Sequence, residues 1–151
     1  MKRAAVPSIL IAVVLFAVGV IAEAQQQAKT FKVGWLESAT TDRGSRLGDI
    51  FLRRLAKLGF VEGKNIAFEY RSADNKLDRL PALVDELVRL NVDVLLTSAT
   101  PATIAAKNAA KTIPIVFIQL GVDPVTAGFV DSLARPGGNI TGFNLRVLIW
   151  V

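Results

Sequence analysis

The sequence contains neither cysteine nor histidine among its 151 residues. Without cysteine there is no disulfide bond, no thiol nucleophile and no lipid-modified cysteine. Without histidine, a Ser-His catalytic pair and a standard zinc site are excluded as well. Most carboxylates, such as those of Asp85 and Glu86, occur at helical spacing beside basic residues, as on a solvated helix face. The sequence therefore predicts a protein that is not an enzyme and that needs no cofactor or metal.

Long hydrophobic runs are also missing, except near the N-terminus. Residues 9–21 are almost wholly apolar, follow a basic pair, and precede the small-x-small sequence Ala22-Glu23-Ala24. This order predicts a signal peptide over residues 1–24, cleaved before Gln25, and hence export to the periplasm. The run is shorter than the ~20 residues that span a bilayer, and a retained membrane anchor is the alternative to cleavage.

The positive charge of the chain is dispersed. The formal net charge is +5 at pH 7, and the densest basic pair beyond the predicted signal peptide is Arg53-Arg54. Nucleic-acid binding requires a basic patch or stripe rather than a scattered excess. We therefore expect no nucleic-acid partner.

The stretch from Val92 to Ile118 carries the clearest structural pattern. Residues 92–97 and 113–118 are short, apolar and rich in β-branched side chains, which is typical of strands buried on both faces of a parallel sheet. Between them, Thr100 can cap a helix that has Pro101 at its first position. Such a strand–helix–strand unit places free helix-start N–H groups at the carboxyl end of a strand, where ligands of α/β sheets bind. The alternative is that Thr100-Pro101 is only a good cap.

The rest of the chain repeats this alternation. Further strands are predicted at 32–36, 66–70 and 140–143, and further helices at 47–58, 80–88 and 125–133, the last with Ala127, Val130 and Leu133 facing inward. The order predicts an α/β fold: a doubly wound, mostly parallel five-stranded sheet with right-handed crossovers and helices on both faces. Residues 25–143 then form one N-terminal α/β lobe.

Small polar side chains follow the predicted strands at their carboxyl ends. They are Ser38 after the first strand, Thr97, Ser98 and Thr100 after the third, and Gln119 and Asp123 after the fourth. Because these ends meet at one edge of a parallel sheet, they predict a recognition surface for a small polar ligand. No nucleophile–base pair accompanies them, which favours binding over catalysis. Each residue also has a purely structural interpretation: capping for Ser98 and Thr100, and turn formation for Asp123, which precedes Pro124.

Several segments resemble a known family. They are residues 58–66, 69–71, 80–83, 92–94, 100–102, 112–117 and 123–125, and the run Leu133-Ala134-Arg135-Pro136-Gly137-Gly138-Asn139-Ile140-Thr141-Gly142-Phe143. In this order they resemble the substrate-binding proteins of ABC transporters, in the branch related to aromatic-amino-acid binders.

The resemblance implies a periplasmic-binding-protein-like fold of two α/β lobes that trap a small ligand and deliver it to an ABC permease in the membrane. Carried over by position, the first-lobe ligand contacts are Ser38, Ser98, the helix start Thr100-Pro101-Ala102, and Asp123 in its turn. An amino-acid-like or other small acidic ligand would set its carboxylate on the Thr100 helix start.

The C-terminal sequence departs from the family pattern. Relatives continue into a second lobe, whereas residues 144–151 here form an atypical apolar tail. We expect a first lobe only, with the second lobe absent. The alternative function is an orphan lobe that binds no ligand, or that self-associates into a homo-oligomer through its exposed edge and tail.

Overall fold

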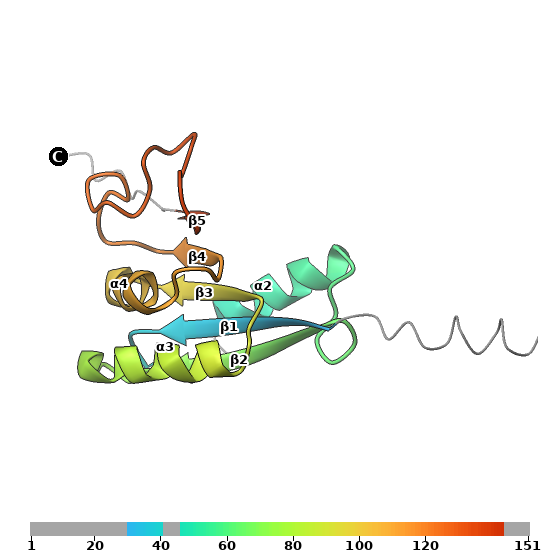
Figure 1. Ribbon diagram of the computed structural model, residues 1–151. Helices are drawn as coiled ribbons and strands as arrows, with labels where there is room; N and C mark the ends of the chain where they lie inside the picture. Colours follow the sequence, from blue (N-terminus) through green and yellow to red (C-terminus); the bar gives the residue numbers. More distant parts are fainter. Residues whose placement is uncertain (1–29, 41–45, 144–151) are drawn as a thin grey trace, which may run out of the picture.

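The computed structural model of the protein describes residues 30–40 and 46–143 (Figure 1). The predicted signal peptide and the tail at 144–151 lie outside the described residues. Within these ranges no helix is long and apolar enough to cross a membrane. The elements are β1 (Phe31–Glu37), α2 (Arg46–Lys57), β2 (Ile66–Ser72), the 3-10 helix η1 (Leu77–Arg79), α3 (Leu80–Arg89), β3 (Val94–Ser98), α4 (Thr100–Ala109), β4 (Ile115–Ile118) and β5 (Ile140–Phe143).

The five strands form one sheet in the order β2-β1-β3-β4-β5, and all four pairings are parallel. The predicted parallel five-stranded sheet is therefore confirmed. Figure 1 shows α2 on the far side of the sheet from α3, so helices cover both faces, as expected for a doubly wound fold.

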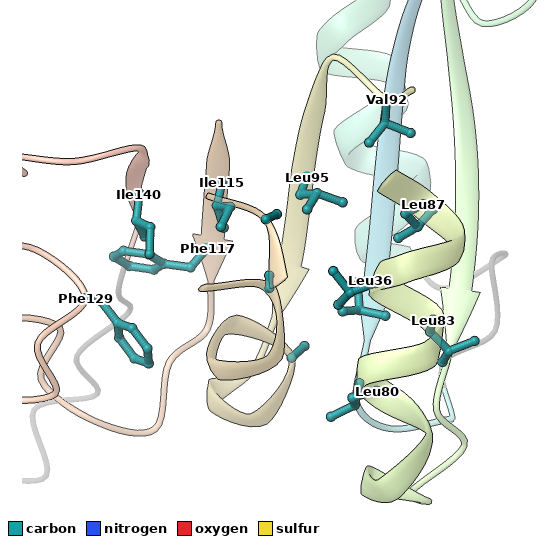
Figure 2. Packing of buried hydrophobic residues seen from close by; sticks show 14 of the residues in the cluster. Leu36, Leu80, Leu83, Leu87, Val92, Leu95, Ile115, Phe117, Phe129 and Ile140 are labelled. Carbon is teal, nitrogen blue, oxygen red and sulfur yellow. The ribbon is translucent and has the colours of Figure 1, made fainter. Parts of the chain in front are cut away.

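The face that carries α3 and α4 holds the larger core. Figure 2 shows Leu36 of β1 lying opposite Leu83 and Leu87 of α3, with all three buried. Gly34 makes room for this packing, because a Cβ at that position would lie 3.3 Å from Leu87 Cδ2 of α3 and 2.9 Å from Leu95 Cδ2 of β3. The same cluster continues across the sheet through the buried residues Leu95, Ala102, Ala106, Ile115, Phe117, Phe129 and Ile140.

The opposite face is built around aromatic rings. Trp35 packs edge-to-face on Phe51 of α2, with ring centroids 5.4 Å apart, and also contacts Phe68 and Tyr70 of β2. The predicted helix thus packs through Phe51. Two of its other apolar positions do not face the core: Ile50 is 48% exposed and Leu58 is 73% exposed. Leu58 also lies just beyond the end of α2, which explains its exposure.

The predicted helix at 125–133 is wrong: residues 124–128 form a turn, and residues 129–133 form bends and irregular structure. The Ala127 N–H donates to Asp123 O (2.9 Å) and the Phe129 N–H donates to Pro124 O (2.9 Å), which closes a single turn. Gly128 then takes a positive φ of 67°, a conformation that ends a helix.

The inward-facing residues of this segment also differ from the prediction. Phe129 and Val130 are buried, whereas Ala127 is exposed and Leu133 is 75% exposed. Lys107 of α4 holds the turn from outside, because its Nζ donates to Gly128 O and lies 5.8 Å from the centroid of the Phe129 ring.

Candidate ligand-binding site

The carboxyl ends of the five parallel strands lie along one edge of the sheet, here named the carboxyl edge. β1 connects to β2 on one side and β3 connects to β4 on the other side, so the connections that leave this edge after β1 and after β3 run in opposite directions. Ligands of open α/β sheets bind at such a switch point. Ser38 follows β1 and Ser98 ends β3, so two of the predicted ligand-binding residues flank it.

Ser38 links β1 to the start of α4. Its side chain is buried, and its Oγ accepts the Ala102 N–H (3.1 Å) and donates to Ser98 O (3.4 Å). Ser38 thus caps α4 from another strand. Three predicted site residues, Ser38, Ser98 and Ala102, are therefore in direct contact.

The predicted capping role of Thr100 is wrong. The cap position of α4 is Ala99, without a side-chain cap hydrogen bond, and Thr100 is the first residue of the helix. The Thr100 hydroxyl instead accepts the Gly121 N–H (3.1 Å), which ties the helix start to the turn after β4. The hydroxyl does not cap α4, because it points toward the turn after β4 rather than back over its own helix.

The Thr100 hydroxyl can still donate one hydrogen bond. A hydroxyl has one proton and two acceptor lone pairs. Its oxygen accepts from Gly121, and within residues 30–40 and 46–143 its proton has no protein acceptor. Thr100 is only half-buried, so this proton can reach an acceptor atom of a ligand.

The helix start offers fewer amides than the sequence suggested. Pro101 has no N–H, the Ala102 N–H goes to Ser38, and the Thr103 N–H goes to Ala99 O at 3.3 Å. Of the first four α4 residues, only Thr100 has a backbone N–H without a protein acceptor in the described part of the chain. The helix dipole adds a partial positive charge at this position. The donors for a ligand thus converge on Thr100.

Backbone strain marks the same edge. Ala99 has φ 68° and ψ 162°, a region that is nearly restricted to glycine. Positive φ values also occur at Gln119 after β4 and at Asp74 and Asn75 after β2. Strained residues that persist in a fold cluster at functional sites. Asp and Asn adopt the left-handed region readily, and Asn91 does so at the opposite edge, so the strained residue that marks the start of α4 is Ala99.

Two predicted edge residues have structural roles. The Asp123 Oδ1 accepts the N–H groups of Val125 (3.0 Å) and Thr126 (2.9 Å), which is the turn-forming role considered from the sequence. The Thr97 hydroxyl is fully buried and faces Thr103 of α4, so Thr97 does not belong to the edge surface. A ligand contact by Asp123 stays a prediction.

The loop after β2 is a part of the edge that sequence reasoning missed. Ser72 Oγ donates to Ala39 O (2.9 Å) and the Asn75 N–H donates to Ser38 O (3.0 Å), so this loop holds the segment after β1 in place. Only its polar composition after a predicted strand could have indicated this role. Glu37 was also missed: it is 8% exposed, and its Oε1 accepts the Trp35 indole N–H at 2.8 Å.

Together these features define a class of protein. An α/β lobe that gathers hydroxyl and amide donors at its switch point, in a sequence without a nucleophile–base pair, is suited to binding a small ligand. The comparisons with known proteins agree. The chain belongs to the ABC transporter substrate binding protein family, whose model matches residues 47–149. Members of this family are binding proteins rather than enzymes, and they are typically extracellular or periplasmic.

Individual relatives support the assignment. The chain is 36% identical over 92 residues to the tyrosine-binding protein of Clostridioides difficile, an alignment that covers 61% of this chain and 26% of that protein. It is similar to the ligand-free, open structure of a substrate-binding protein with adhesive properties from Clostridium difficile, with a TM-score of 0.67 and 30% identity over 75% of this chain and 38% of that one.

A third likeness concerns the fold alone. An ABC domain from Streptococcus pneumoniae, solved in complex with L-Trp, is 23% identical, with a TM-score of 0.68 over 77% of this chain and 39% of that chain. The chain thus spans about a quarter of the tyrosine-binding protein and less than two fifths of either solved structure. What it matches is the first lobe of a periplasmic-binding-protein-like fold.

Proposed function

We propose that this chain forms the first lobe of a periplasmic receptor that captures a small amino-acid-like or other small acidic solute for an ABC importer. The observation that carries the proposal is the junction at Thr100 near the switch point, where an N–H and a hydroxyl proton have no acceptor within the described residues. Membership of the substrate-binding family and the likeness to a tyrosine-binding protein support it. The partners are then a small ligand and the ABC permease that receives it.

In the proposed complex the ligand carboxylate lies on Thr100. Both donors of this residue can serve one carboxylate, and Pro101 adjoins them. The buried residues Ser38, Ser98 and Ala102 support the helix start from beneath. Asp123 borders the site from the turn after β4. Each charge-assisted hydrogen bond contributes ~1.5–3 kcal/mol.

Thr100→Val tests this binding mode, because valine keeps the shape and removes the hydroxyl. We expect binding of L-tyrosine to weaken about tenfold or more, since each 1.4 kcal/mol is a factor of ten. The matched control is Thr112→Val, an exposed threonine before β4 that is outside the carboxyl edge. NMR titration up to millimolar L-tyrosine is the measurement, because the described lobe contacts a ligand from one side only and such a one-sided site is expected to bind weakly.

Two results would count against the proposal. If Thr100→Val binds as well as the unmodified chain, Thr100 is not the carboxylate site. If the unmodified chain shows no saturable shift of carboxyl-edge amides with L-tyrosine or L-glutamate, the alternative of a lobe without ligand binding is favoured. The exposed side chains of Leu133 (75%) and Phe143 (76%) then make self-association the more plausible property.

We also propose that residues 1–24 act as a signal peptide and that the mature lobe begins at Gln25. The basic pair, the apolar run and Ala22-Glu23-Ala24 support this proposal. Mass spectrometry of the exported protein should find an N-terminus at Gln25, within one or two residues. An intact Met1 in the membrane fraction would contradict cleavage and favour a retained anchor.

A further inference from the structure

Two fully buried threonine hydroxyls form a row of hydrogen bonds behind the proposed site. Thr97 of β3 and Thr103 of α4 are both 0% exposed, and their Oγ1 atoms are 2.9 Å apart. Thr103 Oγ1 also lies 3.0 Å from Ala99 O. A carbonyl oxygen can only accept, so the Thr103 proton goes to Ala99 O and the Thr97 proton goes to Thr103 Oγ1. The donors of this row of hydrogen bonds therefore have a fixed direction, from Thr97 through Thr103 to the carbonyl oxygen of Ala99.

Ala99 is the residue in the strained conformation between β3 and α4. Its φ of 68° and ψ of 162° are costly for a residue with a Cβ, so surrounding contacts must hold it there. Its N–H donates to Ile118 O (3.1 Å), and its carbonyl accepts both the Thr103 hydroxyl and, at 3.3 Å, the Thr103 N–H. The hydroxyl bond is shorter than the amide bond. Among the described residues, it is also the one hydrogen bond of Ala99 to which a side chain contributes.

We propose that Thr97 and Thr103 are positioning residues that hold Ala99 in its strained conformation and thereby orient the Thr100 donors before a ligand arrives. This inference rests on the proposed function of Thr100. Pre-orientation strengthens binding because the junction is already ordered, so its ordering entropy is not lost when the ligand binds. Neither threonine touches the ligand.

The decisive variant is the double substitution Thr97→Val and Thr103→Val. Valine has the shape of threonine, and removing both partners leaves no buried hydroxyl without a hydrogen bond, so global stability should change little. The junction, however, loses its hydroxyl contact. We expect amide hydrogen exchange of the Ala99 N–H to accelerate about tenfold in the full chain, with less than twofold change at Leu95 in the same strand. Binding of L-tyrosine should weaken about threefold to tenfold.

Thr103→Ser is the rescue control, because it keeps the hydroxyl and removes only a methyl group. Its Ala99 exchange rate should stay within about twofold of the unmodified chain, although the lost methyl lowers stability more than the double valine variant does. If Thr103 merely filled space, Ala99 exchange would be faster in Thr103→Ser than in the double valine variant. Equal exchange at Ala99 in the folded double valine variant and the unmodified chain would overturn the proposal.

Ala99→Gly supplies a second test that does not depend on the double variant folding. Glycine adopts this conformation without strain, so we expect the unfolding equilibrium constant to fall severalfold despite the added freedom of the unfolded chain. An unchanged or higher constant would contradict the strain on which the positioning role depends. The exchange readout decides the positioning role, and the tyrosine titration decides the proposed function. Accelerated exchange at Ala99 in the double valine variant, without tyrosine binding by the unmodified chain, would therefore contradict the ligand assignment but not the positioning role.

Discussion

The two faces of the sheet are covered in different ways. On the α3/α4 face, buried aliphatic side chains form one cluster that reaches from β1 through β3 and β4 to β5. On the α2 face the buried cluster is limited to Val33, Ile66 and Leu96, and the β4 residues Val116 and Ile118 are only partly buried. Among the described residues, regular close packing is thus concentrated on one face. Because the α3/α4 face contains most of the buried apolar side chains of the described residues, we expect it to supply most of the stability.

Matched valine truncations should reveal the difference most strongly. Val84→Ala on α3 removes two methyl groups from a side chain that is 0% exposed, and we expect a loss of about 2–3 kcal/mol in unfolding free energy. Val116→Ala removes the same groups from the partly covered α2 face and should cost about half as much. Urea denaturation followed by circular dichroism measures both. Equal losses would show that the α2 face is as tightly packed as the α3/α4 face.

Overpacking gives a second, smaller contrast. Gly34→Ala places a methyl group 2.9 Å from Leu95 Cδ2 of β3 and 3.3 Å from Leu87 Cδ2 of α3, so these buried side chains must shift within the packed core. We expect a loss of about 1–3 kcal/mol, the usual cost of an inserted methylene in a packed core. Gly138→Ala is a control with open space around the added atom. If Gly34→Ala has no larger effect than this control, the two leucine side chains can move aside and the core next to β1 is less tightly packed than the structure indicates.

The part of the fold that depends on local pattern could be predicted from the sequence. Residues 92–118 contain two β-branched runs around a helix that has Pro101 in its first turn, and each feature acts within a few positions. The strand–helix–strand unit follows from these local preferences. The helix predicted at 125–133 failed because apolar spacing alone does not reveal that Gly128 takes a positive φ.

The site could be placed by topology but its contacts could not. The carboxyl ends of parallel strands meet at one edge, so Ser38, Ser98 and Thr100 could be assigned to the same edge from their order in the chain. That Ser38 caps α4 at Ala102, 64 positions away, has no local signal. The strain at Ala99 was hidden for a related reason: glycine normally marks such a conformation, and here tertiary hydrogen bonds hold an alanine in it.

The smallest contrast concerns the segment after β4, which joins the α3/α4 face through turns rather than a helix. Lys107 Nζ donates to Gly128 O and lies 5.8 Å from the centroid of the Phe129 ring, so one cation fastens this segment to α4. Lys107→Met keeps the apolar stem and removes both interactions, and we expect a loss of about 1 kcal/mol. Thermal unfolding should show a midpoint lower by about 3–5 °C, because the size of this lobe lies between small domains, which shift by ~4–8 °C per kcal/mol, and larger ones, which shift by ~2–4 °C.

A local measurement separates this effect from a general loss of stability. Exchange of the Phe129 N–H, which donates to Pro124 O, should accelerate more in Lys107→Met than exchange of Leu95 in β3. Lys64→Met, an exposed lysine in the turn before β2, should change neither rate. Parallel acceleration at Phe129 and Leu95 would mean that the segment unfolds only together with the sheet. In that case the turns after β4 are as firmly attached to the α3/α4 face as α4 itself, and the cation stabilises the whole lobe rather than this segment alone.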